Sequence, residues 1–267
     1  MEPIDQEPSP PKARRGIYLL PNLFTTAGLF AGFYGIVAAI GGHYQIAAMA
    51  IFVAMIMDGI DGRVARLTNT QSEFGVQYDS LTDMVCFGLA PALIMYQWAL
   101  RDLAAFGWFW AKVGWLVAFV YAASGALRLA RFNAQVAVAD KRYFQGLPSP
   151  SAAAVVIGLV WVGAALEVEG AKFAWAGMVV TLLAGLLMVS NFRYYSFKEL
   201  DFRNKVPFFV LLLAVLVLVF TALDTPKVLF LGFFTYALSG PAITLWHIRQ
   251  RRRAKHEPPP ADMHDSE

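Results

Sequence analysis

The sequence has few charges, a single cysteine and few histidines, and each scarcity excludes a class of protein. Only 15% of the 267 residues are charged and 58% are hydrophobic, an apolar share above the roughly 45–50% of soluble domains. Cys86 is the only cysteine, so no disulfide can form within the chain. The histidines, His43, His247, His256 and His264, are too scattered to form a zinc-type ligand cluster. An ordinary cytosolic globule, a disulfide-stabilised domain and a zinc protein are therefore not expected.

The apolar residues instead form long runs. These runs are about 17 to 24 residues long, enough to cross a hydrocarbon core of about 30 Å as helix. We therefore predict an all-α polytopic membrane protein with about eight transmembrane helices. The predicted spans are 22–41, 45–63, 79–99, 106–127, 150–166, 172–190, 206–222 and 228–248.

Both ends of the chain are polar and rich in proline. Residues 1–11 (MEPIDQEPSPP) have no apolar periodicity, and we expect a disordered N-terminal tail. Residues 249–267 begin with a basic stretch and end in a similar proline-rich segment, so we expect a basic and then disordered C-terminal tail. No basic start followed by an apolar stretch and a cleavage site opens the chain, and a cleaved signal peptide is not expected.

The basic residues report orientation in the membrane. They lie in short loops without an aromatic-rich basic face, so the net charge of +3 does not indicate a nucleic-acid partner. Of the 22 Lys and Arg residues, 18 fall in one set of alternate loops and termini and only four in the other. Because basic loops tend to remain in the cytoplasm, we expect both termini and the basic loops on the cytoplasmic side.

Residues 58–83, DGIDGRVARLTNTQSEFGVQYDSLTD, place four aspartates at the cytoplasmic ends of two consecutive predicted spans. An acidic side chain at the centre of a membrane helix costs about 2.5 to 3.5 kcal/mol, and less near the interface. The four are Asp58, Asp61, Asp79 and Asp83. So many acids in so short a segment indicate a functional site.

Helical spacing puts these carboxylates on two stripes. Asp79 and Asp83 are one turn apart on the second of the two helices, and Gly75 precedes Asp79 by one turn. On the first helix, rotation about the helix axis places four residues within about 80° of Asp58: Asp61, Gly62, Ala65 and Arg66. Two antiparallel helices joined by a short loop can then bring all four carboxylates together.

A cluster of carboxylates requires a compensating cation, and an all-oxygen site suits Mg²⁺ or Mn²⁺. Gly62, Ala65 and Gly75 leave space for a large ligand, and Arg66 offers a donor fork suited to phosphate. Taken singly, the small residues would be helix-packing positions, and Arg63 and Arg66 would be topological flanks. Two arginines cannot neutralise four carboxylates, so the pattern favours a site for a metal-bound phosphate ester.

The segment resembles a known family. It matches D-x2-D-G-x2-A-R-x8-G-x3-D-x3-D, the pattern of the CDP-alcohol phosphotransferases, at all eight specified residues. The resemblance implies a membrane enzyme that displaces CMP from a CDP-linked lipid or alcohol by the hydroxyl of a second alcohol. It implies that residues 12–200 form a catalytic membrane domain of six helices, with 201–248 adding two more, and that the enzyme is a homodimer.

Residue roles also follow from the resemblance. The resemblance implies that two ions of Mg²⁺ or Mn²⁺ are bound by Asp58, Asp61, Asp79 and Asp83. It also implies that Asp83 is the general base. PNLFTTAGLFAGF at 21–33 resembles the family's first helix. The residues implied to bind the CDP-lipid are Asn22, Thr25, Asp61, Gly62, Ala65 and Arg66.

Three further segments resemble the bacterial, integral-membrane branch of the family that makes phosphatidylserine. They are ALRLARFN at 126–133, FQGLPSPSAAA at 144–154 and LMVSNFRYYSFK at 187–198. This resemblance implies CDP-diacylglycerol and L-serine as substrates and the bacterial inner (cell) membrane as the location. Arg128, Arg131 or Arg193 would hold the serine carboxylate, although each also fits a topological flank.

The sequence leaves alternatives open for the acceptor alcohol and for the class of protein. Glycerol 3-phosphate, inositol phosphate or choline is the main rival to serine as the acceptor. A cation-coupled transporter would also bury carboxylates, but it would show paired discontinuous helices in two halves. The spans 206–222 and 228–248 carry no acid in their apolar stretches and are expected to be a scaffold or lipid-facing addition.

Overall fold

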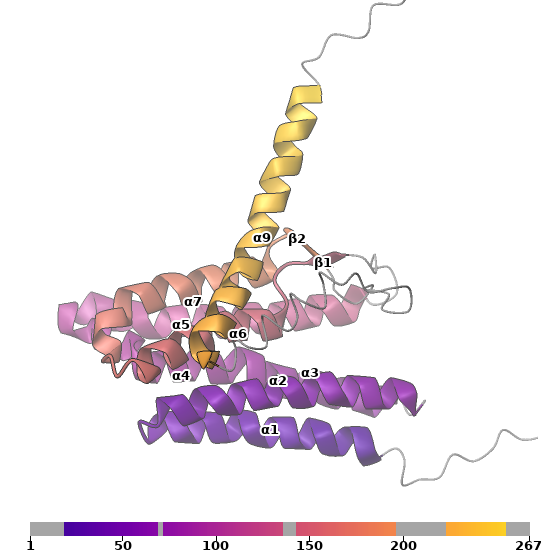
Figure 1. Ribbon diagram of the computed structural model, residues 1–267, viewed down its shortest axis with the longest axis horizontal. Coiled ribbons are helices and arrows are strands. Elements are labelled where there is room, and N and C mark those ends of the chain that lie inside the picture. The colour runs from indigo at the N-terminus through magenta and orange to yellow at the C-terminus, as the bar shows by residue number, and fades with distance from the viewer. Residues whose placement is uncertain (1–18, 69–71, 136–142, 196–222, 255–267) are drawn as a thin grey trace, which may run out of the picture.

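A computed structural model describes residues 19–68, 72–135, 143–195 and 223–254. This part of the chain is helical except for one pair of short strands (Figure 1). In chain order the elements are α1 (Leu19–Ile40), α2 (Tyr44–Leu67), α3 (Glu73–Asp83), the π-helical turn η1 (Met84–Leu89), α4 (Ala90–Trp98), the 3-10 helix η2 (Leu100–Phe106), α5 (Trp108–Gln135), β1 (Tyr143–Gln145), α6 (Ser149–Ala165), the 3-10 helix η3 (Gly170–Phe173), α7 (Ala174–Val189), β2 (Arg193–Tyr195) and α9 (Thr225–Ala254).

The helices make this a multi-pass membrane protein, as the apolar runs predicted. Five of the described helices are long and apolar enough to cross a membrane, and six if the bent pair 73–98 and 100–106 is one span. Helix α6 is apolar but has 17 residues, about 26 Å of helix, which is shorter than a hydrocarbon core. The predicted span 206–222 and the tails 1–11 and 257–267 lie outside the described residues. The predicted number of eight spans is therefore not reproduced in the described part.

Helix α6 lies inside the bundle because it is apolar on every side. Eleven of its residues are buried, and a helix without a polar face must be covered all round. It packs against α2, α4, α7 and α9. Gly158 allows the close approach of α9, since a Cβ there would contact Phe230 at 3.2 Å. Protein covers much of α6, which explains how a helix this short is accommodated.

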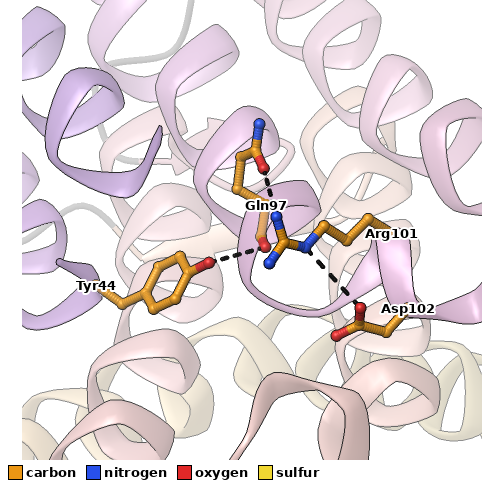
Figure 2. A network of polar contacts seen from close by, with 4 residues as sticks. All are labelled: Tyr44, Gln97, Arg101 and Asp102. Atoms are coloured by element: carbon orange, nitrogen blue, oxygen red, sulfur yellow. Dashed lines mark hydrogen bonds and ion pairs between the residues drawn. The ribbon is translucent and has the colours of Figure 1, made fainter. Parts of the chain in front are cut away.

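A polar network closes the end of the bundle where α2 begins and α4 ends (Figure 2). The Tyr44 hydroxyl donates to the Gln97 carbonyl oxygen at 3.0 Å, and Arg101 Nη1 donates to Gln97 Oε1 at 3.2 Å. Arg101 Nε also lies 3.9 Å from Asp102 Oδ1. These contacts fix the start of α2 to the bend between α4 and η2.

The opposite end collects most of the remaining polar side chains. The helices from α1 to α7 run in alternate directions when α3, η1 and α4 are taken as one continuous span, so the start of α1, the end of α2, the end of α5 and the start of α6 meet there (Figure 1). The antiparallel strands β1 and β2 lie at the same end, with Phe144 opposite Tyr194. The sequence did not predict this hairpin, because strands of three residues are too short to show an alternating pattern.

Candidate functional site

Three of the four predicted aspartates form a compact cluster. Asp58 and Asp61 come from α2 and Asp79 from α3, and one carboxylate oxygen of each lies within 4.8 Å of the others. Asp61 is buried and the other two are half-buried. The convergence of two consecutive helices, predicted from the spacing alone, therefore occurs in the fold.

Asp83 lies beside this cluster, one turn further along α3. All four aspartates line one narrow cleft, together with Thr25. The Asp83 carboxyl group interacts electrostatically with those of Asp58 and Asp79. The Oδ1 atom of Asp83 is buried and has no hydrogen-bond partner among the described residues. A buried acceptor without a donor is costly, so this oxygen is suited to receive a proton or to face a cation.

The residues of the cleft fit a hard divalent ion. The donors are carboxylate oxygens, which such ions prefer. Thr25 Oγ1 donates to Asp61 Oδ2 at 2.7 Å, which fixes the orientation of this carboxylate. Hydrogen bonds from neighbouring residues to a metal-binding side chain orient it toward the metal. Asp58, Asp61 and Asp79 are therefore the residues positioned to hold a metal.

Helix α1 holds this arrangement in place through two neighbouring threonines. Thr25 is buried and bonds Asp61, while the Thr26 hydroxyl lies 2.9 Å from the Tyr78 hydroxyl on α3. Asn22 Oδ1 lies 3.6 Å from the position that a Cβ of Gly75 would take. Thr25 and Asn22 are the two α1 residues predicted to bind the CDP-lipid. Thr25 contacts Asp61, a predicted metal ligand, and Asn22 lies against Gly75 of α3.

A π-helical turn follows Asp83 directly. In η1 the helix widens over six residues, and such insertions occur frequently at functional sites. Close packing accompanies the turn: the Cys86 thiol donates to the Gly28 carbonyl at 3.3 Å, and a Cβ on Gly32 would clash with Cys86. The turn thus lies tightly against α1, just beyond the carboxylates. Helical periodicity could not predict it, because a single wide turn leaves the pattern of apolar residues nearly unchanged.

Three of the predicted CDP-lipid residues, Gly62, Ala65 and Arg66, lie on the open side of the cluster. Apart from the backbone of α2 itself, no atom of the described residues lies within 4 Å of the position that a Cβ of Gly62 would take. Arg66 is exposed, and its Nε donates to the Gly62 carbonyl at 2.9 Å. Ala65 is half-buried on the same helix. The described residues therefore leave the space beside Gly62 unfilled, as a ligand-binding position requires.

The three predicted acceptor arginines differ in their surroundings. Arg128 interacts electrostatically with Asp83, its Nη1 donates to Ser149 Oγ at 2.8 Å, and its Nε is buried without a hydrogen-bond partner among the described residues. The side chain of Arg193 lies outside the described residues. Of the two arginines whose side chains the structure describes, Arg128 is therefore the one that interacts with an aspartate of the site.

Arg131 instead forms hydrogen bonds to two segments at the end of the bundle that holds the aspartates. Its two terminal nitrogens donate to the carbonyl oxygens of Val189, Ser190 and Gln145 at 3.1 to 3.4 Å, and to Asn191 Oδ1 at 3.2 Å. These acceptors belong to the end of α7, to the residues just after it and to strand β1. Such a full set of partners is typical of a structural role.

Two residues near Arg128 were not singled out from the sequence. Ser149 is buried at the start of α6 and accepts from Arg128. Tyr236 of α9 interacts electrostatically with Arg128. The sequence contains no signal for Tyr236, because almost 110 residues separate Tyr236 from Arg128 and the sequence of α9 is typical of a lipid-facing helix.

Comparisons with known proteins show which family the chain resembles over most of its length. The family model described as CDP-alcohol phosphatidyltransferase matches residues 18–187. A Helicobacter pylori protein named CDP-diacylglycerol–serine O-phosphatidyltransferase is 39% identical over 220 residues, which cover 82% of this chain and 88% of that protein. Proteins of the same name from Methanocaldococcus jannaschii and Saccharomyces cerevisiae are 33% and 38% identical over 54% and 53% of this chain, and over 61% and 53% of their own lengths.

Proposed function

The chain belongs to the CDP-alcohol phosphatidyltransferase family, and on that premise we propose that it transfers the phosphatidyl group of CDP-diacylglycerol to the hydroxyl of L-serine. The products are phosphatidylserine and CMP. The observation that carries the proposal is the cleft lined by Asp58, Asp61, Asp79 and Asp83. The name shared by the similar proteins supports serine as the acceptor.

The four carboxylates divide into two roles. Asp58, Asp61 and Asp79, with Asp83 at the edge, would hold two ions of Mg²⁺ or Mn²⁺, whose charge offsets that of the pyrophosphate and of the departing CMP. Asp83 accepts the proton of the serine hydroxyl. The serine oxygen then forms a bond to the phosphorus that carries the diacylglycerol, and the bond from that phosphorus to the CMP oxygen breaks. The buried Oδ1 of Asp83, without a partner among the described residues, supports its part in this step.

The pocket for the CDP-lipid extends from the buried edge of the cluster to the exposed residues beside it. We assign it to Asn22, Thr25, Asp61, Gly62, Ala65 and Arg66. Arg66 lies one turn from Gly62 and is exposed, so its guanidinium can reach a phosphate of the substrate. Gly62 leaves the room that the nucleotide needs.

Replacement of Gly62 by Ala tests this pocket without disturbing the fold. No neighbouring side chain or helix in the described part of the chain opposes the added methyl group, and alanine is favoured over glycine in a helix by about 0.5–1 kcal/mol. We expect thermal stability equal to or above that of the wild type, together with a rise in KM for CDP-diacylglycerol. The matched control is Gly232→Ala on α9, where the surroundings are equally open and KM should not change. An unchanged KM in Gly62→Ala would remove this residue from the pocket.

The acceptor pocket is assigned to Arg128. A serine carboxylate needs a cationic partner close to the general base, and Arg128 has an available donor and interacts with Asp83. Arg131 and Arg193 were equal candidates from the sequence. The donors of Arg131 are already bound to four protein oxygens, so we assign it to holding the loops in place.

Replacing these arginines one at a time should separate the two roles. Arg128→Lys keeps the charge but loses the planar fork, and we expect KM for serine to rise by about tenfold or more with KM for CDP-diacylglycerol little changed. In Arg131→Lys the loops lose hydrogen bonds, so thermal stability should fall. A serine KM that is normal in Arg128→Lys and raised in Arg131→Lys would reverse the assignment.

An acceptor panel tests the proposed function itself. Purified enzyme in vesicles with CDP-diacylglycerol and Mn²⁺ or Mg²⁺ is given serine, glycerol 3-phosphate, inositol phosphate or choline, and CMP is measured. We expect release with serine above all others. Release with a different alcohol would replace serine but keep the chemistry, whereas no release with any of them would favour a transporter.

Topology and assembly complete the proposal. We place both termini and the aspartates on the cytoplasmic side of the bacterial cell membrane, because the basic loops lie at that end. Residues 12–200 would form the catalytic membrane domain and 201–248 two further helices, for about eight spans in all. A homodimer is expected of the family.

A further inference from the structure

A side-chain hydrogen bond links the helix that carries Asp83 to the helix that carries Arg128. Asn133 Nδ2 of α5 donates to Ser80 Oγ of α3 at 3.1 Å, and Ser80 Oγ donates to the Val76 carbonyl oxygen at 3.0 Å. Because a hydroxyl has one proton, Ser80 can only accept from the amide. This chain of bonds joins α3 to α5 at the end of the bundle that holds the site.

The other side-chain hydrogen bonds at this end of α5 lead away from α3. Arg128 binds Ser149 at the start of α6. Arg131 binds carbonyl oxygens of β1, of the end of α7 and of the residue after it. Within the described part of the chain, Asn133 therefore provides the side-chain hydrogen bond that holds this end of α5 to α3.

A second contact holds the same two helices together further from the site end. Helix α5 packs against η1, where Gly125 lies so close to Gly88 that a Cβ on Gly125 would meet the Gly88 Cα at 3.3 Å. Small residues permit such close approach of two backbones. The buried Tyr121 hydroxyl also donates to the Phe87 carbonyl oxygen at 3.0 Å. Helix α5 is thus fixed to the span of α3 and η1 at two levels.

The two contacts share one antiparallel register. On each helix eight residues separate the hydrogen bond from the glycine contact, about 12 Å of helix. Arg128 comes three residues after Gly125, and Asp83 comes five residues before Gly88. Along the helix axes these are steps of about 4.5 and 7.5 Å from the glycine contact. Asp83 and Arg128 therefore lie at nearly the same level, between the two contacts.

Both of these side chains have a buried atom without a partner. Asp83 Oδ1 and Arg128 Nε are buried and form no hydrogen bond with any described residue. An acceptor with a hydroxyl at one end and a carboxylate at the other would satisfy both atoms at once. It can do so only if the distance between the two side chains matches its length, and that distance is set by the separation of α3 and α5.

We propose that Ser80 and Asn133 are positioning residues that set the distance between Asp83 and Arg128 and so select an acceptor of the length of serine. Without their hydrogen bond, the end of α5 is released from α3 while the glycine contact remains as a pivot. The wider spacing then fits a longer acceptor better and serine less well. The inference rests on the proposed function, because it takes Asp83 as the base and Arg128 as the carboxylate partner.

The test is the replacement Asn133→Ala in the full-length enzyme. Asn133 is exposed, so its truncation leaves no cavity and the fold should survive. We expect KM for serine to rise about fivefold, the effect of losing one hydrogen bond, with KM for CDP-diacylglycerol unchanged. Homoserine, which has one more CH₂ than serine, is added as a competitor. The ratio of its Ki to the serine KM should fall by at least the same factor.

Variants of Ser80 show whether the bond itself is responsible. Ser80→Ala should reproduce the effect of Asn133→Ala, and the double variant should be no worse than either, because both changes remove one interaction. Ser80→Thr keeps the hydroxyl and should retain the wild-type serine KM. The matched control is Gln45→Ala, which removes a side-chain hydrogen bond between α2 and α6 at the opposite end of the bundle and should change neither KM.

Each outcome decides the matter. A serine KM and a homoserine ratio within twofold of the wild type in Asn133→Ala overturn the inference. An equal rise in both KM values with a loss of thermal stability also overturns it, since this would show a purely structural role, and so do additive effects in the double variant. If the wild type releases CMP only with another alcohol, the proposed acceptor fails on its own. The inference is then decided by the KM for that alcohol, which should rise in both alanine variants and stay normal in Ser80→Thr.

Discussion

Asp83→Asn should lower kcat by about two to four orders of magnitude, the range for loss of a general base. The amide has nearly the same size and can still accept a hydrogen bond, but it cannot take the proton of the acceptor hydroxyl. Binding of CDP-diacylglycerol should largely survive, because Asp83 lies beside the three clustered carboxylates and not within their set. The measurement is kcat by CMP release, with lipid binding measured separately.

A titration with Mn²⁺ separates this role from metal binding. If Asp83 acts as the base, the rate of Asp83→Asn remains low and flat as Mn²⁺ increases. Recovery to near wild-type turnover at high Mn²⁺ would show instead that the residue is chiefly a metal ligand, since weakened occupancy is overcome by mass action. Partial recovery would assign both roles to it.

Asp79→Asn should abolish CMP release at ordinary metal concentrations. This change removes an anionic ligand from a cluster whose oxygens lie within 4.8 Å of one another, so affinity for the divalent ion falls. Unlike Asp83→Asn, it should regain activity as Mn²⁺ rises. Direct binding of Mn²⁺ to the purified protein, followed by electron paramagnetic resonance, should show the weakened affinity.

The matched control for this change is Asp102→Asn. Asp102 lies at the opposite end of the bundle, where it contacts Arg101 (Figure 2). We expect both activity and Mn²⁺ affinity to match the wild type there. Full activity of Asp79→Asn at low metal would contradict the assignment of the cluster as the metal site.

The sequence predicted the core of the site because that signal is local. Asp58 and Asp61 share a helix face, Asp79 lies one short loop further on, and helical geometry brings them together without knowledge of the remaining fold. The apolar runs located seven of the helical segments for the same reason. Burial of these acids in a membrane helix is costly enough that their function could be inferred.

Contacts between distant segments could not be predicted in this way. The distinction between Arg128 and Arg131, which are three residues apart on α5, depends on which loops fold back over them. The position of α9 depends on the hydrogen bond from the Tyr194 hydroxyl to the Ala237 carbonyl, which joins residues far apart in the sequence. The π-helical turn after Asp83 reflects close packing on Gly28 and Gly32 of α1, which no periodicity in α3 reveals.

The most direct test of the account is the stoichiometry of the reaction. The purified enzyme is placed in vesicles that contain CDP-diacylglycerol, isotopically labelled serine is added with Mn²⁺ or Mg²⁺, and CMP and labelled phosphatidylserine are both quantified. The account predicts equal amounts of the two products, and neither product after the divalent ion is removed by a chelator. Release of CMP without labelled lipid, or full activity in the presence of the chelator, would contradict it.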